Sequence, residues 1–211
     1  MQTQVGTRIG EYTLVRPLGS GGMGEVWLAS CDGLEKPFVI KLLLPRHCNS
    51  ASHRRRFMRE AKLVASLPHG RIVPVVDYGE ASDRLFIVMA YVDGVDLQTF
   101  CNALQAKGVQ LPYYVIIYIL AEILEALRDA HTHTVNGELR PVIHRDIKPS
   151  NVLISSRGGV FLTDFGIALL DNDYSLETFG TLGYMAPEQA RGNSRPVPQC
   201  DIFGVGGIAH F

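Results

Sequence analysis

The sequence lacks the features that mark a secreted, membrane-spanning or metal-scaffolded protein. It has only four cysteines, which are far apart and show no paired metal-ligand spacing, so we expect reduced thiols in a cytoplasmic protein. The first residues have neither a basic start nor an apolar core, so they do not resemble a secretory signal. The most apolar stretch, residues 113–127, is interrupted by Glu122 and Glu125 and is too short to span a bilayer.

An excess of charge of one sign is also missing. The formal net charge is -1, so a general nucleic-acid-binding surface is not expected. The one basic run, residues 53–56, is interpreted as a solvated helix start. With 46% apolar residues, the 211-residue chain can form one sizeable core or two small lobes.

Apolar periodicity predicts strands and one helix in the first half of the chain. A helix is expected at 51–67. The expected strands are 9–16, 25–29, 38–43, 73–78 and 85–91. After Gly94 the pattern changes.

The second half is expected to be mainly helical. Helical spacing covers residues 96–107 and 113–133, and a polar, turn-rich loop follows at 134–141. Short strands are expected at 152–155 and 160–163.

Gly19, Gly21 and Gly24 have the spacing of a phosphate-binding turn, which alone is weak evidence. In dinucleotide-binding folds such glycines lead directly into a helix. Here a strand pattern begins at Val26 and Trp27, which favours a hairpin whose flexible tip covers phosphates. An ordinary glycine-rich turn is the alternative.

Lys41, in the next strand, favours the phosphate interpretation. Such a lysine is usually a surface residue, but beside a phosphate-covering loop its ammonium can hold the α and β phosphates. Glu60, on the apolar-patterned face of the predicted helix, is the carboxylate that would fix it. The alternative for Glu60 is a surface pair with Arg56.

Residues 144–151, His-Arg-Asp-Ile-Lys-Pro-Ser-Asn, are the most specific pattern in the chain. Asp-Phe-Gly follows at 164–166 and Ala-Pro-Glu at 186–188. In these motifs the chain resembles the eukaryotic-type (Hanks-type) protein kinases, and specifically their bacterial Ser/Thr members. The resemblance covers residues 8 to about 208.

The resemblance implies an α+β, protein-kinase-like bilobal fold in residues 8–211. Residues 8–93 would form a small antiparallel-sheet N-lobe with one helix, and residues 94–211 a mainly helical, incomplete C-lobe. The implied activity is transfer of the ATP γ-phosphate to Ser or Thr hydroxyls of proteins, with ATP and Mg²⁺ as cofactors. The resemblance also allows a homodimer for autophosphorylation.

The resemblance assigns four residues to catalysis. Asp146 would accept or orient the proton of the substrate hydroxyl, and Lys148 would steady the γ-phosphate. Lys41, fixed by Glu60, would hold the other phosphates.

Asn151 and Asp164 are implied as oxygen ligands of Mg²⁺. Asp96 would meet the ribose, and Met89 would stand at the back of the adenine pocket. The implied nucleotide contacts are Leu18, Gly19, Ser20, Gly21, Gly22, Met23, Gly24, Glu25, Val26, Val39, Lys41, Met89, Ala90, Val92, Asp96 and Leu153.

The segment between the Asp-Phe-Gly and Ala-Pro-Glu motifs is the implied switch, with Ser175 or Thr178 as the phosphorylated residue. Thr181 would contact Asp146 and Lys148 in the substrate pocket. Glu177 would partly replace a phosphate by pairing with Arg145.

Two sequence features depart from the expected pattern or are open to more than one interpretation. Val39 stands where the family usually has alanine, which adds bulk beside the adenine and costs about 1–3 kcal/mol unless neighbours adjust. His131 and His133 have the spacing of a metal pair, but two polar residues at a helix end are favoured because no other ligands are nearby in sequence.

The end of the chain gives a second functional hypothesis. Asp201 is expected to support the backbone of His144 and Arg145, whereas the helices that should follow, including an arginine partner for Glu188, are missing before Phe211. The alternative to an active kinase is therefore a non-catalytic nucleotide-binding interaction module or an inactive truncated remnant.

Overall fold

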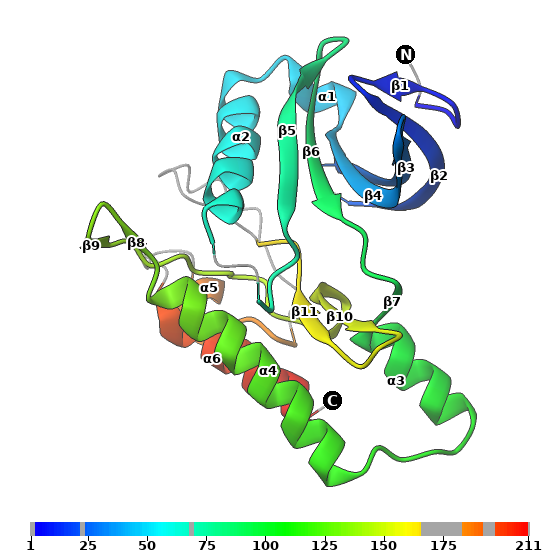
Figure 1. Cartoon of the computed structure of the whole chain (residues 1–211). Coiled ribbons are helices and arrows are strands. Elements are labelled where there is room, and N and C mark those ends of the chain that lie inside the picture. The colour runs from blue at the N-terminus through cyan, green and yellow to red at the C-terminus, as the bar shows by residue number, and fades with distance from the viewer. Residues whose placement is uncertain (1–2, 22–23, 68–69, 166–182, 192–196, 211) are drawn as a thin grey trace. The chain divides into compact units, whose positions relative to one another are not determined.

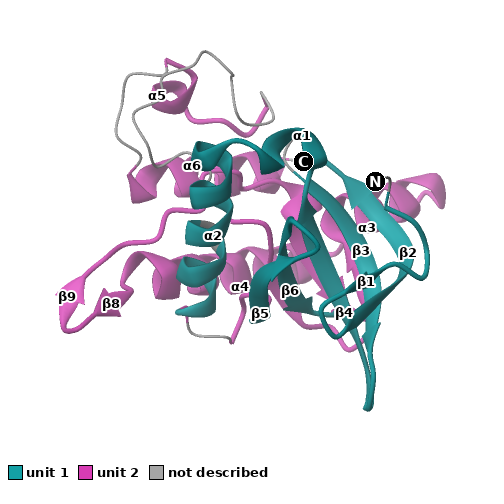
Figure 2. Cartoon of the chain, turned by 90° about the horizontal axis from the view of Figure 1, so that it is seen from above, with its two compact units in different colours: residues 1–66, 74–91 teal, residues 67–73, 92–211 magenta. Residues whose placement is uncertain are grey.

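The computed structural model describes residues 3–21, 24–67, 70–165, 183–191 and 197–210, and for Glu60 the backbone only. The chain divides into two compact units, which Figure 2 colours separately. Unit 1 consists of Met1–Ser66 and Pro74–Tyr91, and unit 2 of Leu67–Val73 and Val92–Phe211.

Unit 1 is built on an antiparallel sheet with strand order β1-β2-β3-β4-β6-β5. Its strands are β1 (Arg8–Ile9), β2 (Tyr12–Ser20), β3 (Gly24–Cys31), β4 (Leu34–Leu43), β5 (Val75–Ala81) and β6 (Arg84–Ala90). The last two strands form a tight hairpin because Ser82 and Asp83 both adopt positive φ, as a two-residue turn with the twist of the sheet requires.

Alternation along the strands separates the two faces of this sheet. One face holds the main core of unit 1, where Trp27, Ile40, Leu42 and Val88 are buried against one another. Their neighbours in sequence point to the opposite face, because successive side chains of a strand alternate.

Two helices belong to unit 1. The short α1 (Pro45–Cys48) was not predicted, whereas α2 (Ala51–Ala65) falls within the predicted helix. The Ser50 side chain caps α2 by accepting a hydrogen bond from the His53 amide. The helix packs against β5 and β6, beside which it lies in Figure 1, and it buries Phe57, Ala61 and Val64.

Unit 2 is mainly helical. Its helices are α3 (Leu97–Ala106), α4 (Tyr113–His131), α5 (Pro187–Ala190), α6 (Pro198–His210) and the 3-10 turn η1 (Pro149–Asn151). Its strands are β7 (Gly94–Asp96), β8 (Thr134–Val135), β9 (Glu138–Leu139), β10 (Val152–Ser155) and β11 (Val160–Leu162). The predicted fold class, an antiparallel sheet with one main helix followed by a mainly helical region, is confirmed.

The predicted loop at 134–141 contains a small hairpin. β8 pairs with β9, and the turn between them places Asn136 and Gly137 at positive φ. Asn-Gly is the usual sequence of such a turn. The composition of this segment correctly indicated a turn, but strands of two residues are too short to give an alternating pattern.

Helix α6 closely approaches residues 144–151, called the catalytic segment from here on because of the role predicted for them, at one glycine. A Cβ added to Gly204 would lie 2.8 Å from Cβ of Ile147 and 3.0 Å from its carbonyl oxygen. Gly204 therefore lets the helix backbone touch the segment that carries the His-Arg-Asp motif.

The outer faces of two helices in unit 2 expose large apolar side chains. On α4 these include Tyr114, Ile117 and Leu124, and on α6 Ile202 and Phe203. None of the helices in the described ranges is both long and apolar enough to span a membrane.

Candidate active site

The catalytic segment of unit 2 holds the carboxylate of Asp146 between two polar side chains. Lys148 Nζ lies 2.7 Å from Asp146 Oδ2. Asn151 Nδ2 donates to the same oxygen at 3.0 Å and to the Asp146 carbonyl oxygen at 2.8 Å. Three of the predicted site residues, far too polar for an ordinary core, are thus brought together in one short loop.

Asp201 fixes the backbone at the start of this segment. Its carboxylate is fully buried and accepts hydrogen bonds from the backbone amides of His144 (2.8 Å) and Arg145 (2.7 Å). His131 Nε2 donates to the same carboxylate at 2.8 Å. The expected support by Asp201 is confirmed. His131, interpreted from the sequence as a polar residue at a helix end, helps to hold the Asp201 carboxylate in place.

The ring of His144 links the Asp146 segment to the Asp-Phe-Gly segment. Its Nε2 donates to the carbonyl oxygen of Thr163 at 3.0 Å, and its Nδ1 accepts from the Asp146 amide at 3.3 Å. The centre of its ring lies 4.5 Å from the centre of the Phe165 ring, and the two rings are tilted by 40°. Complete burial lowers the pKa of His144, so the ring is held neutral, in agreement with Nδ1 acting as an acceptor.

Arg145 is buried in a conformation that costs backbone energy. It has φ +70°, a region that non-glycine residues rarely adopt. Burial lowers the pKa of its guanidinium to about 10, although Asp201 partly opposes this. Within the described part of the chain, no group accepts a hydrogen bond from its Nε or Nη1.

Gln189 is a site-supporting residue that sequence reasoning missed. Its Nε2 donates to the Arg145 carbonyl oxygen at 3.0 Å, and its Oε1 accepts from the Ala186 amide at 3.2 Å. The side chain thereby connects helix α5, at the Ala-Pro-Glu motif, with the catalytic segment. Its position directly after that motif was the only signal.

The predicted metal ligands Asn151 and Asp164 offer oxygen atoms. Asn151 is buried, and because its Nδ2 is committed to Asp146, its Oδ1 is the atom available to a cation. Asp164 has φ +56°, a second strained backbone position in the segment. Among the described residues no group of three or more His, Cys, Asp or Glu could hold a metal ion. The two oxygen donors, Asn151 Oδ1 and the Asp164 carboxylate, are of the kind that Mg²⁺ takes together with phosphate oxygens and water.

In unit 1, strand register brings the predicted nucleotide residues onto one face of the sheet. Val26 pairs with Lys41, and Val39 pairs with Met89. Directly opposed residues share a face, and so do Val39 and Lys41, two apart on β4. These four side chains therefore lie together on the face opposite the main core of unit 1.

The loop between β2 and β3 is tied at its base. The Gly21 amide donates to the Gly24 carbonyl oxygen at 2.8 Å. A Cβ on Gly24 would lie 2.9 Å from the Leu42 carbonyl oxygen, so this position requires glycine. Residues 18–21 are exposed, whereas the predicted contacts Gly22 and Met23 lie outside the described residues.

Glu25, predicted as a nucleotide contact, has its side chain engaged within unit 1. Its Oε1 accepts from Arg84 and Thr3, each at 2.8 Å, and its Oε2 from Trp27 Nε1 at 3.0 Å. Partial burial alone would raise the pKa of Glu25, but these three hydrogen bonds outweigh it and the pKa is lowered. Glu25 can therefore offer a nucleotide its backbone rather than its carboxylate.

The residues predicted to meet adenine and ribose also have local partners. The Ala90 amide donates to the Pro74 carbonyl oxygen at 2.9 Å, so an adenine contact here falls to the Ala90 carbonyl group. Asp96 caps α3, and its two oxygens accept from the amide (2.9 Å) and the hydroxyl (2.7 Å) of Thr99. Leu153, half-buried in β10, pairs with Asp96.

Several predicted residues cannot be placed. The side chain of Glu60 is outside the described residues, although its backbone lies in α2. Ser175, Glu177, Thr178 and Thr181 fall within 166–182, which is also outside the described residues.

Glu188 was expected to have no partner, but its carboxylate accepts a hydrogen bond. The buried thiol of Cys200 donates to Glu188 Oε1 at 3.3 Å. Burial raises the pKa of this thiol, which keeps it protonated and able to donate. A thiol is a weak donor, so this contact is a modest substitute for an arginine.

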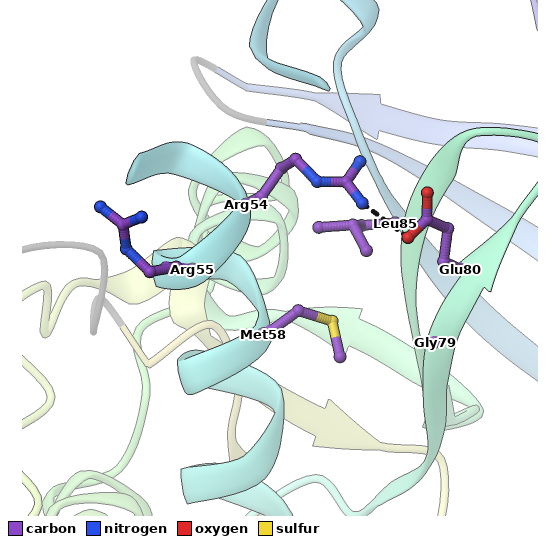
Figure 3. A pocket seen from close by; sticks show the side chains of 6 residues that line it. All are labelled: Arg54, Arg55, Met58, Gly79, Glu80 and Leu85. Atoms are coloured by element: carbon purple, nitrogen blue, oxygen red, sulfur yellow. Dashed lines mark hydrogen bonds and ion pairs between the residues drawn. The ribbon is translucent and has the colours of Figure 1, made fainter. Parts of the chain in front are cut away.

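A pocket of about 290 Å³ in unit 1 lies apart from these residues. Figure 3 shows Met58 of α2 and Leu85 of β6 on its apolar side, with Arg54 reaching across to Glu80 and Arg55 pointing away. Arg54 Nη2 lies 2.6 Å from Glu80 Oε2. Among the described residues, none of those predicted for catalysis or nucleotide binding lines it.

Comparison with known proteins places these motifs in one family. Residues 12–210 match the protein kinase domain family. The chain is 38% identical over 200 residues to the probable serine/threonine-protein kinase PknB of Lactococcus lactis, which covers 92% of this chain and 30% of that protein. It is 36% identical over 207 residues to the serine/threonine-protein kinase PrkC of Bacillus subtilis, covering 96% and 30%.

A third relative carries a different residue specificity in its name. The tyrosine-protein kinase MasK of Myxococcus xanthus is 38% identical over 205 residues, covering 93% of this chain and 32% of that protein. Among solved structures, the kinase domain of Mycobacterium tuberculosis PknI is similar with a TM-score of 0.74 and 32% identity, over 99% of this chain and 76% of that one. The chain spans about a third of the length of these curated relatives.

Proposed function

Because this chain belongs to the protein kinase domain family, we propose that it transfers the γ-phosphate of ATP to Ser and Thr hydroxyls of proteins, including its own. The observation that carries the proposal is the arrangement at Asp146, whose carboxylate is held by Lys148 and Asn151 yet remains partly exposed. Phosphoryl transfer depends on positioning and charge neutralisation more than on covalent chemistry, and these three residues supply both.

Asp146 is proposed to orient the substrate hydroxyl and to accept its proton. Lys148 and Asn151 both engage Oδ2. Oδ1 is therefore the oxygen that would meet the hydroxyl. Lys148, 2.7 Å from the carboxylate, is placed to steady the transferred phosphate at the same point. A lysine at this position is typical of Ser/Thr rather than Tyr kinases, which favours Ser and Thr as acceptors.

Mg²⁺ is proposed to be held by Asn151 Oδ1 and the Asp164 carboxylate together with phosphate oxygens. When bound, the ion neutralises charge on the phosphates. The chain's contribution is to fix the two oxygen donors, through the Asn151–Asp146 hydrogen bonds and the strained backbone of Asp164.

ATP is proposed to lie against the sheet face that carries Val26, Val39, Lys41 and Met89. Lys41, steadied by Glu60, would hold the α and β phosphates, and the glycine-rich loop would cover them. The remaining contacts would come from the Ala90 and Val92 backbone, Leu153, and Asp96 toward the ribose.

Arg145 is proposed to bind a negatively charged group from the segment between the Asp-Phe-Gly and Ala-Pro-Glu motifs. Its buried guanidinium lacks acceptors for two nitrogens among the described residues, and an unpaired buried cation is costly. Glu177 would supply a carboxylate and so partly replace a phosphate at Ser175 or Thr178. If the Glu177→Gln variant is as active as wild type, this pairing is wrong.

The proposed setting is the cytoplasm, where ATP and protein substrates are available. The cysteines at 31, 48, 101 and 200 are free thiols, as a reducing compartment requires. Autophosphorylation between two copies is proposed as the first reaction, and no nucleic-acid partner is proposed.

The proposal is tested with the purified chain incubated with radiolabelled ATP and Mg²⁺. We expect a cooperative melt, a higher melting midpoint when ATP and Mg²⁺ are added, and label on the chain that is lost in Asp146→Asn. The amide preserves the shape of the carboxylate but cannot accept the proton, so a loss of about 10³-fold or more in rate is expected.

The same experiment separates the alternatives. A nucleotide-dependent rise in the midpoint without any labelling would support the non-catalytic nucleotide-binding module. A melt without a cooperative transition would rule out the enzyme for this chain.

A further inference from the structure

Arg84, the first residue of β6, connects three segments of unit 1 that no sequence motif links. Its Nη2 donates to Glu25 Oε1 at 2.8 Å and to the Leu43 carbonyl oxygen at 2.9 Å. Its Nη1 donates to the Thr3 hydroxyl, and this hydroxyl in turn donates to Glu25 Oε1. One guanidinium thus binds the N-terminal segment, the start of β3 and the end of β4.

The residues that Arg84 holds are placed at the base of the glycine-rich loop. Glu25 follows Gly24 directly, and Leu43 is the residue opposite Gly24 in the β3–β4 ladder. Leu43 also lies two residues beyond Lys41 on β4. Arg84 therefore fastens the two strand ends that carry the loop's last glycine and the proposed phosphate-binding lysine.

Burial makes these contacts stronger than a surface ion pair. The side chains of Arg84 and Glu25 are 13% and 19% exposed, so solvent screens their attraction only weakly. Glu25 is also held from the other side by Trp27, which is part of the core. The carboxylate consequently has both oxygens committed, which restricts the backbone of Glu25.

We propose that Arg84 is a positioning residue for nucleotide binding, which acts through Glu25 and the Leu43 carbonyl group to hold the base of the glycine-rich loop and Lys41 in register. This inference rests on the proposed function, because it assumes that the loop and Lys41 bind the phosphates of ATP. Arg84 touches no substrate itself. Thr3 completes the network, so the N-terminal segment helps to hold Glu25 at the base of the loop.

The test compares wild type with Arg84→Met in the full chain, using two readouts. The first is the separate measurement of KM for ATP and of kcat. We expect Arg84→Met to raise KM for ATP about five- to tenfold with kcat within about twofold, because a misplaced loop weakens binding in both ground and transition states. The second is amide hydrogen exchange, which should become faster in residues 19–28 while exchange in α4 is unchanged.

A matched control removes another arginine–glutamate pair of the same unit. Arg54→Met breaks the contact with Glu80, which lies beside the pocket of Figure 3 and is more exposed. This variant should leave KM for ATP and the exchange of residues 19–28 as in wild type. Arg84→Lys, which keeps the charge but not the forked donors, should recover part of the binding lost in Arg84→Met.

Each further outcome supports or overturns the inference. Equal KM and equal exchange in Arg84→Met and wild type would overturn it, as would equal effects of Arg84→Met and Arg54→Met. If Arg84→Met does not fold, Glu25→Gln, which keeps the shape and the Trp27 contact, takes its place with the same expectation in a milder form. Absence of phosphate transfer by wild type would contradict the proposed function, whereas the exchange comparison would still decide the role of Arg84.

Discussion

A fully buried carboxylate, Asp201, determines the backbone path at the start of the catalytic segment. It accepts from two successive amides and from His131, so its negative charge is distributed over three donors. These hydrogen bonds offset the free-energy cost of burying the carboxylate and the backbone amides in a site that water does not reach. The strained φ of Arg145 persists because this network determines it.

Asp201→Asn is expected to destabilise the chain by about 3 kcal/mol, because one amide oxygen cannot replace two carboxylate oxygens and leaves a buried donor unpaired. The free energy of unfolding in urea measures this. Asp129→Asn is the control: Asp129 forms an ion pair with the exposed Arg128, and its loss should cost less than about 0.5 kcal/mol. Equal effects of the two variants would contradict the role of Asp201.

His144 predicts a pH dependence of stability. Its folded-state pKa is lowered from 6.5 by burial, so below pH 6.5 the unfolded chain takes up a proton that the folded chain refuses. The stability contributed by neutral His144 is complete above pH 6.5. It decreases as the pH falls from 6.5 to the lowered pKa of the folded state, by about 1.4 kcal/mol for each unit by which the pKa is lowered.

The comparison of wild type with His144→Gln isolates this effect. The variant is expected to be less stable at pH 7.5, with the difference becoming smaller at pH 5.5, as measured by melting midpoints. His210→Gln, at an exposed position of α6, should follow the wild-type pH profile. A difference for His144→Gln that is constant with pH would refute the neutral buried ring.

At the scale of elements, helix α6 matters because it carries Asp201 and touches the catalytic segment at Gly204. The helix contains three glycines, which lower its intrinsic stability. Only a close approach explains Gly204, whereas Gly206 is exposed with open space around it. The same residue type therefore has different consequences two positions apart.

Gly204→Ala is expected to destabilise the chain by about 1–3 kcal/mol, because the new methyl group meets Ile147 and pushes α6 from the catalytic segment. Gly206→Ala should instead be neutral or stabilise by up to about 1 kcal/mol, through higher helix propensity. Thermal melts of both variants provide the measurement. Destabilisation by Gly206→Ala of the same size would show that glycine flexibility, not close packing, explains Gly204.

At the scale of the whole molecule, the sequence was informative where a local pattern exists. The longer strands and helix α2 were predictable from apolar periodicity, and Asp146, Lys148 and Asn151 from one contiguous motif. Among contacts between distant residues, the support of His144 and Arg145 by Asp201 was predicted from the resemblance, but other such contacts were not predictable from the sequence. Arg84 and Glu25 are 59 residues apart, and Gln189 and Arg145 are 44 apart. Only the tertiary fold brings such pairs together, and no pattern in the sequence links one partner with the other.

The exposed apolar faces of α4 and α6 lead to a prediction about the chain in solution. Large exposed apolar patches favour association, so we expect concentration-dependent self-association of the chain 1–211. Ile117→Asn, at a position 65% exposed, should reduce association and keep the melting midpoint. Ile119→Asn, on the same helix but 5% exposed, should instead lower the midpoint by burying an unsatisfied amide. Sedimentation that is unchanged in Ile117→Asn would contradict a role of this face.

The central claim is that this chain phosphorylates Ser or Thr and that the reaction depends on Asp146. Phosphoamino-acid analysis after reaction with γ-labelled ATP and Mg²⁺ tests this claim most directly. Wild type is predicted to yield labelled phosphoserine or phosphothreonine, on itself or on an added protein, and Asp146→Asn is predicted to yield none. Label found only on tyrosine, or label of equal amount in wild type and Asp146→Asn, would contradict it.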